Sequence, residues 1–164
     1  MAERIRHTRA ATLARVRGEW RALDKVLSGL TPTDFRRPVF QSETKESWTI
    51  KDAIAHVTAW KWNVHASLVK GPRPYPSAGT VHATNKRIYE RWLRTSGRAV
   101  VADARAAHEA VVKALRAMPA DYFSGKTHSV HWPFDLVGHS TEHRVRHLER
   151  TLGNKTAPRR VRKA

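Results

Sequence analysis

Apolar residues recur every three or four positions along most of this chain, and this spacing puts them on one face of an α-helix. The first such face is predicted before Thr31-Pro32 and consists of Ile5, Leu13, Val16, Trp20, Leu23, Leu27 and Leu30. The second follows Thr49, a candidate N-cap, and consists of Ile50, Ala53, Val57, Trp60, Val64 and Leu68. A proline-rich segment at 71–76 ends the second helix, because proline cannot continue it.

Three further helices are predicted after that segment. A short one spans about 83–93, a long one runs from a cap at Ser96 to Met118-Pro119, and the last spans about 134–152 before Gly153. No segment alternates between apolar and polar positions, so no sheet is expected. The pattern predicts an all-α fold, an up-down four-helix bundle with a short extra helix in the third connection. The bundle is expected to occupy 1–153, and 154–164 to form a basic disordered tail.

Length and composition favour a single domain without thiol chemistry. The chain has 164 residues and no cysteine, which excludes a disulfide scaffold, a thiolate nucleophile and a cysteine-ligated metal. No apolar run approaches the roughly 20 residues of a membrane span, and the N-terminus lacks the apolar core of a signal peptide. The expectation is a cytoplasmic protein with no membrane partner.

Positive charge dominates the sequence, with 31 Lys+Arg against 14 Asp+Glu and a formal net charge of +17. Such an excess attracts polyanions of any kind. The alternative is a solvated basic face that reflects arginine-rich composition. No helix-turn-helix, zinc-finger or aromatic RNA-binding motif is present, so no specific nucleic-acid partner is expected.

Histidines recur every four residues in the last predicted helix, at His139, His143 and His147. This spacing lets neighbouring imidazoles reach one metal ion. An apolar stripe lies nearly opposite them on the helix and consists of Phe134, Val137, Thr141, Val145, Leu148 and Leu152. If that stripe is the core contact, the histidines face solvent or a second groove. On the second helix, His56 lies at the edge of the apolar face, while His65, His82 and His108 are read as surface residues.

Three segments resemble the DinB/YfiT-like four-helix bundles, most closely their ClbS/DfsB branch. Residues 48–60, WTIKDAIAHVTAW, are similar to the W-[ST]-x-K-D-x-[LI]-x-H-[LIV]-x-x-W signature. Residues 85–90, NKRIYE, are similar to N-x-x-[IV]-Y-E, and 139–143, HSTEH, to H-x-x-[EH]-H. The resemblance covers about residues 5–152.

This resemblance implies an often dimeric bundle that holds a divalent metal, nickel or zinc, through three histidines. Carried over to this chain, the ligands are His56, His139 and His143. The ClbS branch is not uniformly metal-binding, and in its register His143 and His147 are the matching pair, so His147 is the substitute ligand. A homodimer is an expected assembly.

The expected activity is that of a metal-dependent hydrolase or transferase acting on a small reactive or xenobiotic molecule. Glu142 or Asp52 could act as general base or orient an imidazole, although Asp52 also suits a helix first turn and Glu142 a pair with Arg146. A pocket for an apolar substrate could be lined by Trp48, Trp60, Tyr75, Tyr89 and Trp132. The alternatives are a non-enzymatic small-molecule binder with a degenerate metal site and a non-specific polyanion or nucleic-acid binder.

Overall fold

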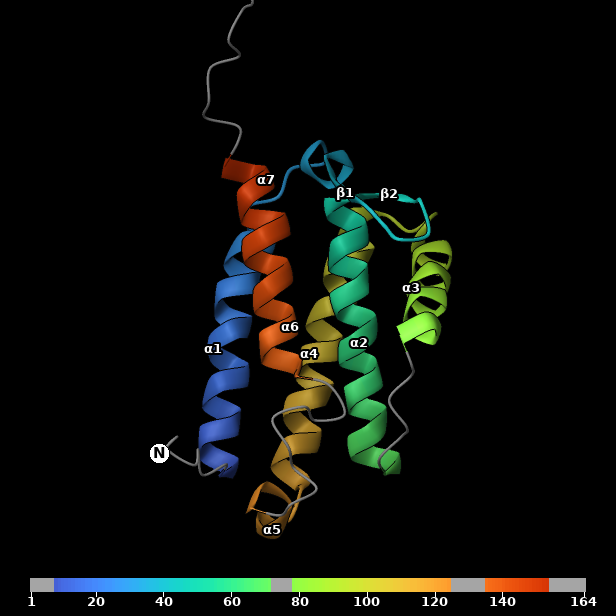
Figure 1. The fold of residues 1–164 in the computed structure, drawn as a ribbon. Coiled ribbons are helices and arrows are strands. Elements are labelled where there is room, and N and C mark those ends of the chain that lie inside the picture. The colour runs from blue at the N-terminus through green and yellow to red at the C-terminus, as the bar shows by residue number, and fades with distance from the viewer. Residues whose placement is uncertain (1–7, 72–77, 125–134, 154–164) are drawn as a thin grey trace, which may run out of the picture.

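Four long helices form the body of the protein in the computed structural model, which describes residues 8–71, 78–124 and 135–153 (Figure 1). The first three are α1 (Arg9–Ser28), α2 (Ile50–Lys70) and α4 (Gly97–Ala117). The fourth is continuous and consists of α6 (Leu136–His143), a π-helix (Arg144–Glu149) and α7 (Arg150–Gly153). The predicted all-α four-helix bundle is confirmed. The predicted tail at 154–164 lies outside the described residues.

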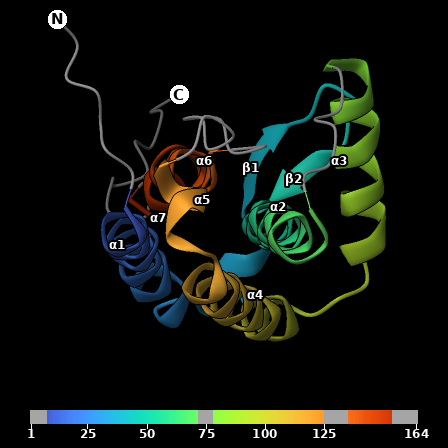
Figure 2. The same cartoon turned by 90° about the horizontal axis from the view of Figure 1, so that it is seen from below.

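The short helix predicted at about 83–93 is α3 (Ala78–Trp92). It lies between α2 and α4, in the second connection of the bundle rather than the third, and the third connection holds α5 (Ala120–Ser124). α3 runs beside α2 on the outside of the bundle, and it carries the chain back so that α2 and α4 point the same way (Figures 1 and 2). The predicted start of the short helix, near residue 83, is later than the observed start at Ala78 by about one and a half turns.

Helix starts follow the capping residues of the sequence. The side chain of Thr49 accepts a hydrogen bond from the backbone N–H of Asp52, whose carboxylate accepts one from Thr49 in return. Thr8 caps α1 and Ser96 caps α4 in the same way, because a side-chain oxygen satisfies an N–H that has no partner within the helix. The caps predicted at Thr49 and Ser96 are therefore confirmed.

A small sheet, which the sequence analysis did not expect, precedes α2. β1 (Pro38–Gln41) pairs antiparallel with β2 (Ser47–Thr49), and Phe40 lies opposite Trp48. The prediction of no sheet is wrong, because strands this short cannot display the alternation by which a sequence pattern is recognised. The hairpin lies at the end of the bundle at which α2 begins (Figure 1).

The core is built around α2, which packs most extensively against α4. Ile50 and Ile54 of α2 are almost fully buried against Val100 and Ala104 of α4. None of the helices in the described part of the chain combines the length and hydrophobicity needed to cross a membrane.

The apolar stripe predicted for the last helix enters the core only in part. Leu148 of the stripe is buried, but Val145 is 45% exposed, and Leu136 and Ser140, which lie outside the stripe, are buried. The cause is the π-helix at Arg144–Glu149, which adds a residue to the turn and shifts the inward face by one position. The histidines preceding it therefore point into the bundle rather than away from it.

Candidate metal centre

Three histidines from two helices meet inside the bundle. His56 comes from α2, and His139 and His143 come from successive turns of α6. One potential ligand atom from each lies within 4.8 Å of the others. The Nε2 atoms of His56 and His139 are 2.8 Å apart, and the ring of His143 is centred 4.6 Å from each of the other two. The structure thus brings together the three residues that the resemblance implies as ligands.

Burial keeps these imidazoles uncharged. His56 is 5% exposed, and its burial, followed by the nearby His143 and His147, lowers its pKa well below the usual value. Burial is also the main cause that lowers the pKa of His139, with His56 and His143 adding to it. The pKa of His143 falls to about 3, mainly through burial. At neutral pH each ring therefore has a nitrogen lone pair to offer.

The donor set fits a divalent metal ion. Ligand nitrogens bound at about 2.0–2.1 Å from one ion lie roughly 3–4 Å from one another, so the spacing of the three rings suits a shared ion. Nδ1 of His56 is buried and has no hydrogen-bond partner among the described residues. A polar atom that is buried without a partner costs free energy. Binding of an ion by the same ring is one reason for a histidine to be kept at this position despite that cost. These residues could hold a metal ion.

His147, the substitute ligand, lies outside this group of three but touches it. Its Nδ1 is 2.9 Å from Nδ1 of His143, and its ring contacts Phe40 of β1. The pKa of His147 is lowered overall, mainly by burial. Glu142 opposes this shift and Arg146 adds to it. A hydrogen bond to the second nitrogen of a ligand ring fixes the orientation of that ring. The geometry thus gives His147 a place beside His143 rather than among the group of three.

Aromatic side chains cover His56. Trp48 meets its ring edge-on at 5.2 Å, and Trp60 does so at 6.3 Å from one turn further along α2. Tyr89 of α3 stacks on Trp48 at 6.0 Å. These contacts bring three of the predicted pocket residues to the cluster, although Trp48 and Trp60 are buried as part of the core. Tyr75 and Trp132, the other two, lie outside the described residues.

The two carboxylates considered as general bases are engaged in structural contacts. Asp52 accepts hydrogen bonds from the N–H and hydroxyl of Thr49 and lies 3.2 Å from the ammonium of Lys51. Glu142 accepts from Arg146 one turn away, and its side chain is 52% exposed. Both contacts match the structural alternatives given by the sequence, and a catalytic role for either stays a prediction.

Glu19 of α1, which sequence reasoning missed, fixes the register of the last helix. Its carboxylate accepts hydrogen bonds from Ser140 and Thr141, and it forms a two-pronged ion pair with Arg144. The side chains of Glu19 and Arg144 are only 8% and 14% exposed, and these bonds raise the pKa of Arg144. Because Arg144 begins the π-helix, this contact holds the turn that directs His143 inward. No motif marks Glu19, since its partners are more than 120 residues away.

A second internal site contains two titratable side chains, Lys61 and His108, whose packing the sequence analysis did not predict. Lys61 is 4% exposed and lies over the ring of Trp20, and burial lowers its pKa to about 8. His108 stacks on the same tryptophan at 4.5 Å. The interpretation of His108 as a surface residue is wrong, because α4 turns it toward α1.

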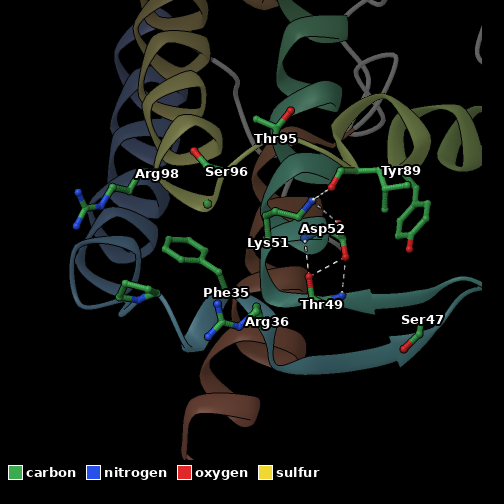
Figure 3. Close-up of a pocket in the computed structure, with 13 residues that line it drawn as sticks. Phe35, Arg36, Ser47, Thr49, Lys51, Asp52, Tyr89, Thr95, Ser96 and Arg98 are labelled. Atoms are coloured by element: carbon green, nitrogen blue, oxygen red, sulfur yellow. Dashed lines mark hydrogen bonds and ion pairs between the residues drawn. The ribbon is translucent and has the colours of Figure 1, made fainter.

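A cavity of about 560 Å³ lies at the start of α2 and α4, away from the three histidines (Figure 3). Tyr89, Asp52 and Lys51 line it, and Lys51 donates to the backbone carbonyls of Trp92 and Leu93. The ammonium group of Lys51 in this wall is therefore already engaged in hydrogen bonds within the protein.

The fold and its histidine cluster place this protein in the DinB/YfiT-like class of helical bundles. Residues 16–149 match the family model described as the mycothiol maleylpyruvate isomerase N-terminal domain, and the chain belongs to this family. The superfamily indicated by the sequence motifs is thereby confirmed. No curated protein matches the chain.

Two solved structures share the fold. An uncharacterised protein from Escherichia coli UTI89 has a TM-score of 0.75 and 15% identity, with 93% of this chain and 97% of that chain covered. The colibactin self-resistance protein ClbS, in complex with dsDNA, has a TM-score of 0.74 and 12% identity, with 95% and 100% covered. At these identities the two structures support the fold of this chain alone.

Proposed function

We propose that this protein is a metal-dependent enzyme, a hydrolase or transferase, that acts on a small reactive or xenobiotic molecule. The observation that carries the proposal is the convergence of three neutral histidines, one buried and two half-buried, on one point inside the bundle. The names of the relatives point the same way. The family is described by an isomerase of a small molecule, and ClbS by self-resistance to colibactin.

His56, His139 and His143 hold the metal in this proposal, and nickel or zinc is the expected ion. A bound divalent ion would supply Lewis-acid chemistry, which polarises an electrophile and makes water a better nucleophile. Three protein ligands suit this use, because they leave a coordination position open for substrate.

Other residues of the chain prepare the site. Trp48 and Trp60 enclose the ring of His56 and exclude water from it. His147 holds the ring of His143 through the contact between their Nδ1 atoms, which leaves Nε2 of His143 to face the cluster. A site kept dry in this way strengthens the electrostatic interactions made inside it.

The test is metal binding by tag-free protein, dialysed against zinc or nickel and analysed for bound metal. Wild type is expected to retain about one ion per chain, and His143→Ala to lose it while the helical circular dichroism stays unchanged. His82→Ala, on the exposed surface of α3, is the matched control and is expected to bind as wild type does. Refusal of both metals by wild type would contradict the proposal.

The second candidate is a metal-free protein that binds small molecules without chemistry. The 2.8 Å contact between His56 and His139 favours it, because one neutral imidazole can donate a hydrogen bond to another and so satisfy the pair without an ion. The same dialysis experiment separates the two candidates. Wild type that binds no metal, and whose buried histidines give imidazole N–H signals shared between rings by NMR, would establish the second.

A further inference from the structure

A second cavity, of about 600 Å³, lies between the hairpin and the C-terminal helix. β1 and the residue before it supply Arg37, Pro38, Val39 and Phe40, and the far wall consists of Arg146, His147, Arg150 and Thr151. Three arginines line this space, and none of the described residues that line it carries a carboxylate. Its volume is in the range of sites that enclose small molecules.

The arginines have hydrogen-bonding capacity that the protein leaves unused. The ion pair of Arg37 with Asp34 is long, at 3.9 Å, beyond the length of a charge-assisted hydrogen bond. Arg150 forms no ion pair within the described part of the chain. Arg146 pairs with Glu142, but both side chains are more than half exposed, so water and salt weaken that pair. The cavity therefore keeps a net positive charge and free donors.

This cavity also lies next to the histidine cluster. His147 lines it and contacts His143 at 2.9 Å, so a single side chain separates the cavity from the candidate metal ligands. The ring of Phe40 lies 4.6 Å from that of His147 and gives the cavity an apolar wall on the same side. A molecule held by the arginines would lie next to the cluster with its apolar part against Phe40.

We propose that this cavity binds the anionic group of a small-molecule substrate, an oxyanion such as a phosphate, sulfonate or carboxylate, through Arg37, Arg146 and Arg150. This inference rests on the proposed function and specifies its substrate class and its route of approach. Guanidinium groups bind oxyanions with two parallel hydrogen bonds, and a concave wall lets three of them converge on one group. A DNA duplex would instead spread its phosphates over a longer surface.

The test uses phenyl phosphate as the probe, titrated into the full chain with a chelator present so that no metal contributes. We expect binding to wild type, followed by isothermal titration calorimetry, and an affinity loss of about tenfold or more in Arg146→Gln/Arg150→Gln. Arg116→Gln, an exposed arginine in the last turn of α4 at the other end of the bundle, removes one charge and is expected to bind as wild type does. The Arg150→Gln single variant, at an exposed position, is expected to give an intermediate loss.

Three results would overturn the inference. They are no binding to wild type at about 10 mM probe, an equal loss in Arg116→Gln, or binding of a short DNA duplex through these arginines without binding of phenyl phosphate. The outcome is separable from that of the proposed function, because the probe is titrated without metal. The double variant is expected to bind metal as wild type does.

Discussion

The Nε2 atoms of His56 and His139 lie 2.8 Å apart although 83 residues separate them in the chain. Two protonated imidazoles would repel each other at this distance, and burial of both disfavours charge on either. At least one of the facing nitrogens must therefore carry a lone pair. This nitrogen can take part either in a hydrogen bond between the two rings or in binding an ion between them. Metal titration distinguishes these two cases.

The three clustered histidines and His147 are expected to differ in how strongly they affect metal binding. His56→Ala and His139→Ala should abolish retention of zinc or nickel, because each removes a ligand. His147→Ala should lower the affinity by about 10–100-fold, the usual effect of losing a residue that orients a ligand. Competition with a chromophoric chelator measures all three. If His147→Ala lost all metal binding while His139→Ala retained it, the ligands on the last helix would be His143 and His147, as in the ClbS/DfsB register.

Glu19→Gln is expected to loosen the C-terminal helix. The substitution leaves Arg144 partly buried with only Glu149 as an anionic partner, which should lower the free energy of unfolding by about 1–3 kcal/mol. Because this contact holds the π-helix, metal affinity should fall as well. Urea unfolding and metal titration test the two effects. Glu149→Gln, at a side chain that is 41% exposed, is the control and should change both only slightly.

The sequence predicted the helices well because their signals are local. The capping box at Thr49 and Asp52, the cap at Ser96 and the three-four spacing of apolar residues each lie within one segment. The motif residues His56, His139 and His143 were likewise visible, since a resemblance marks them without any knowledge of the fold. The structure adds that they meet.

What the sequence could not predict depends on contacts between distant residues. The helical wheel assumed a constant α-helical period, and the π-helix that Glu19 holds through Arg144 breaks it. The condition under which the histidines would face solvent, that the whole apolar stripe is the core contact, is therefore not met. His108 was misjudged for a similar reason, since only the packing of α4 against α1 brings it onto Trp20.

Gly97→Ala is expected to destabilise the protein at the start of α4. A Cβ atom at Gly97 would come within 2.3 Å of the ring of Phe35, which packs against the core. The ring or the helix start must move, and we expect a loss of about 1–3 kcal/mol in the free energy of unfolding. Gly79→Ala in α3 is the matched control, because a Cβ there meets nothing within 4 Å. Because alanine has a higher helix propensity than glycine, Gly79→Ala should leave the free energy of unfolding unchanged or raise it by up to about 1 kcal/mol. Equal stabilities of the two variants would contradict the expectation.

His108 is expected to make the protein less stable in acid. Burial lowers its pKa to about 4, with Lys61 and Arg17 adding to the effect, while an unfolded chain has a histidine pKa of about 6.5. As the pH falls below about 6.5, the unfolded state binds a proton that the folded state does not bind until about pH 4. Acidification within this window therefore favours unfolding.

His108→Phe removes this titration and keeps an aromatic ring on Trp20, where the stacked rings are inclined by only 9°. In metal-free buffer the other buried histidines still make both proteins less stable in acid. The variant should nevertheless lose less stability than wild type between about pH 7 and about pH 5. Urea unfolding at several pH values measures the difference, which should grow as the pH falls. Parallel stability curves for the two proteins would mean that His108 is charged in the folded state as readily as in the unfolded chain.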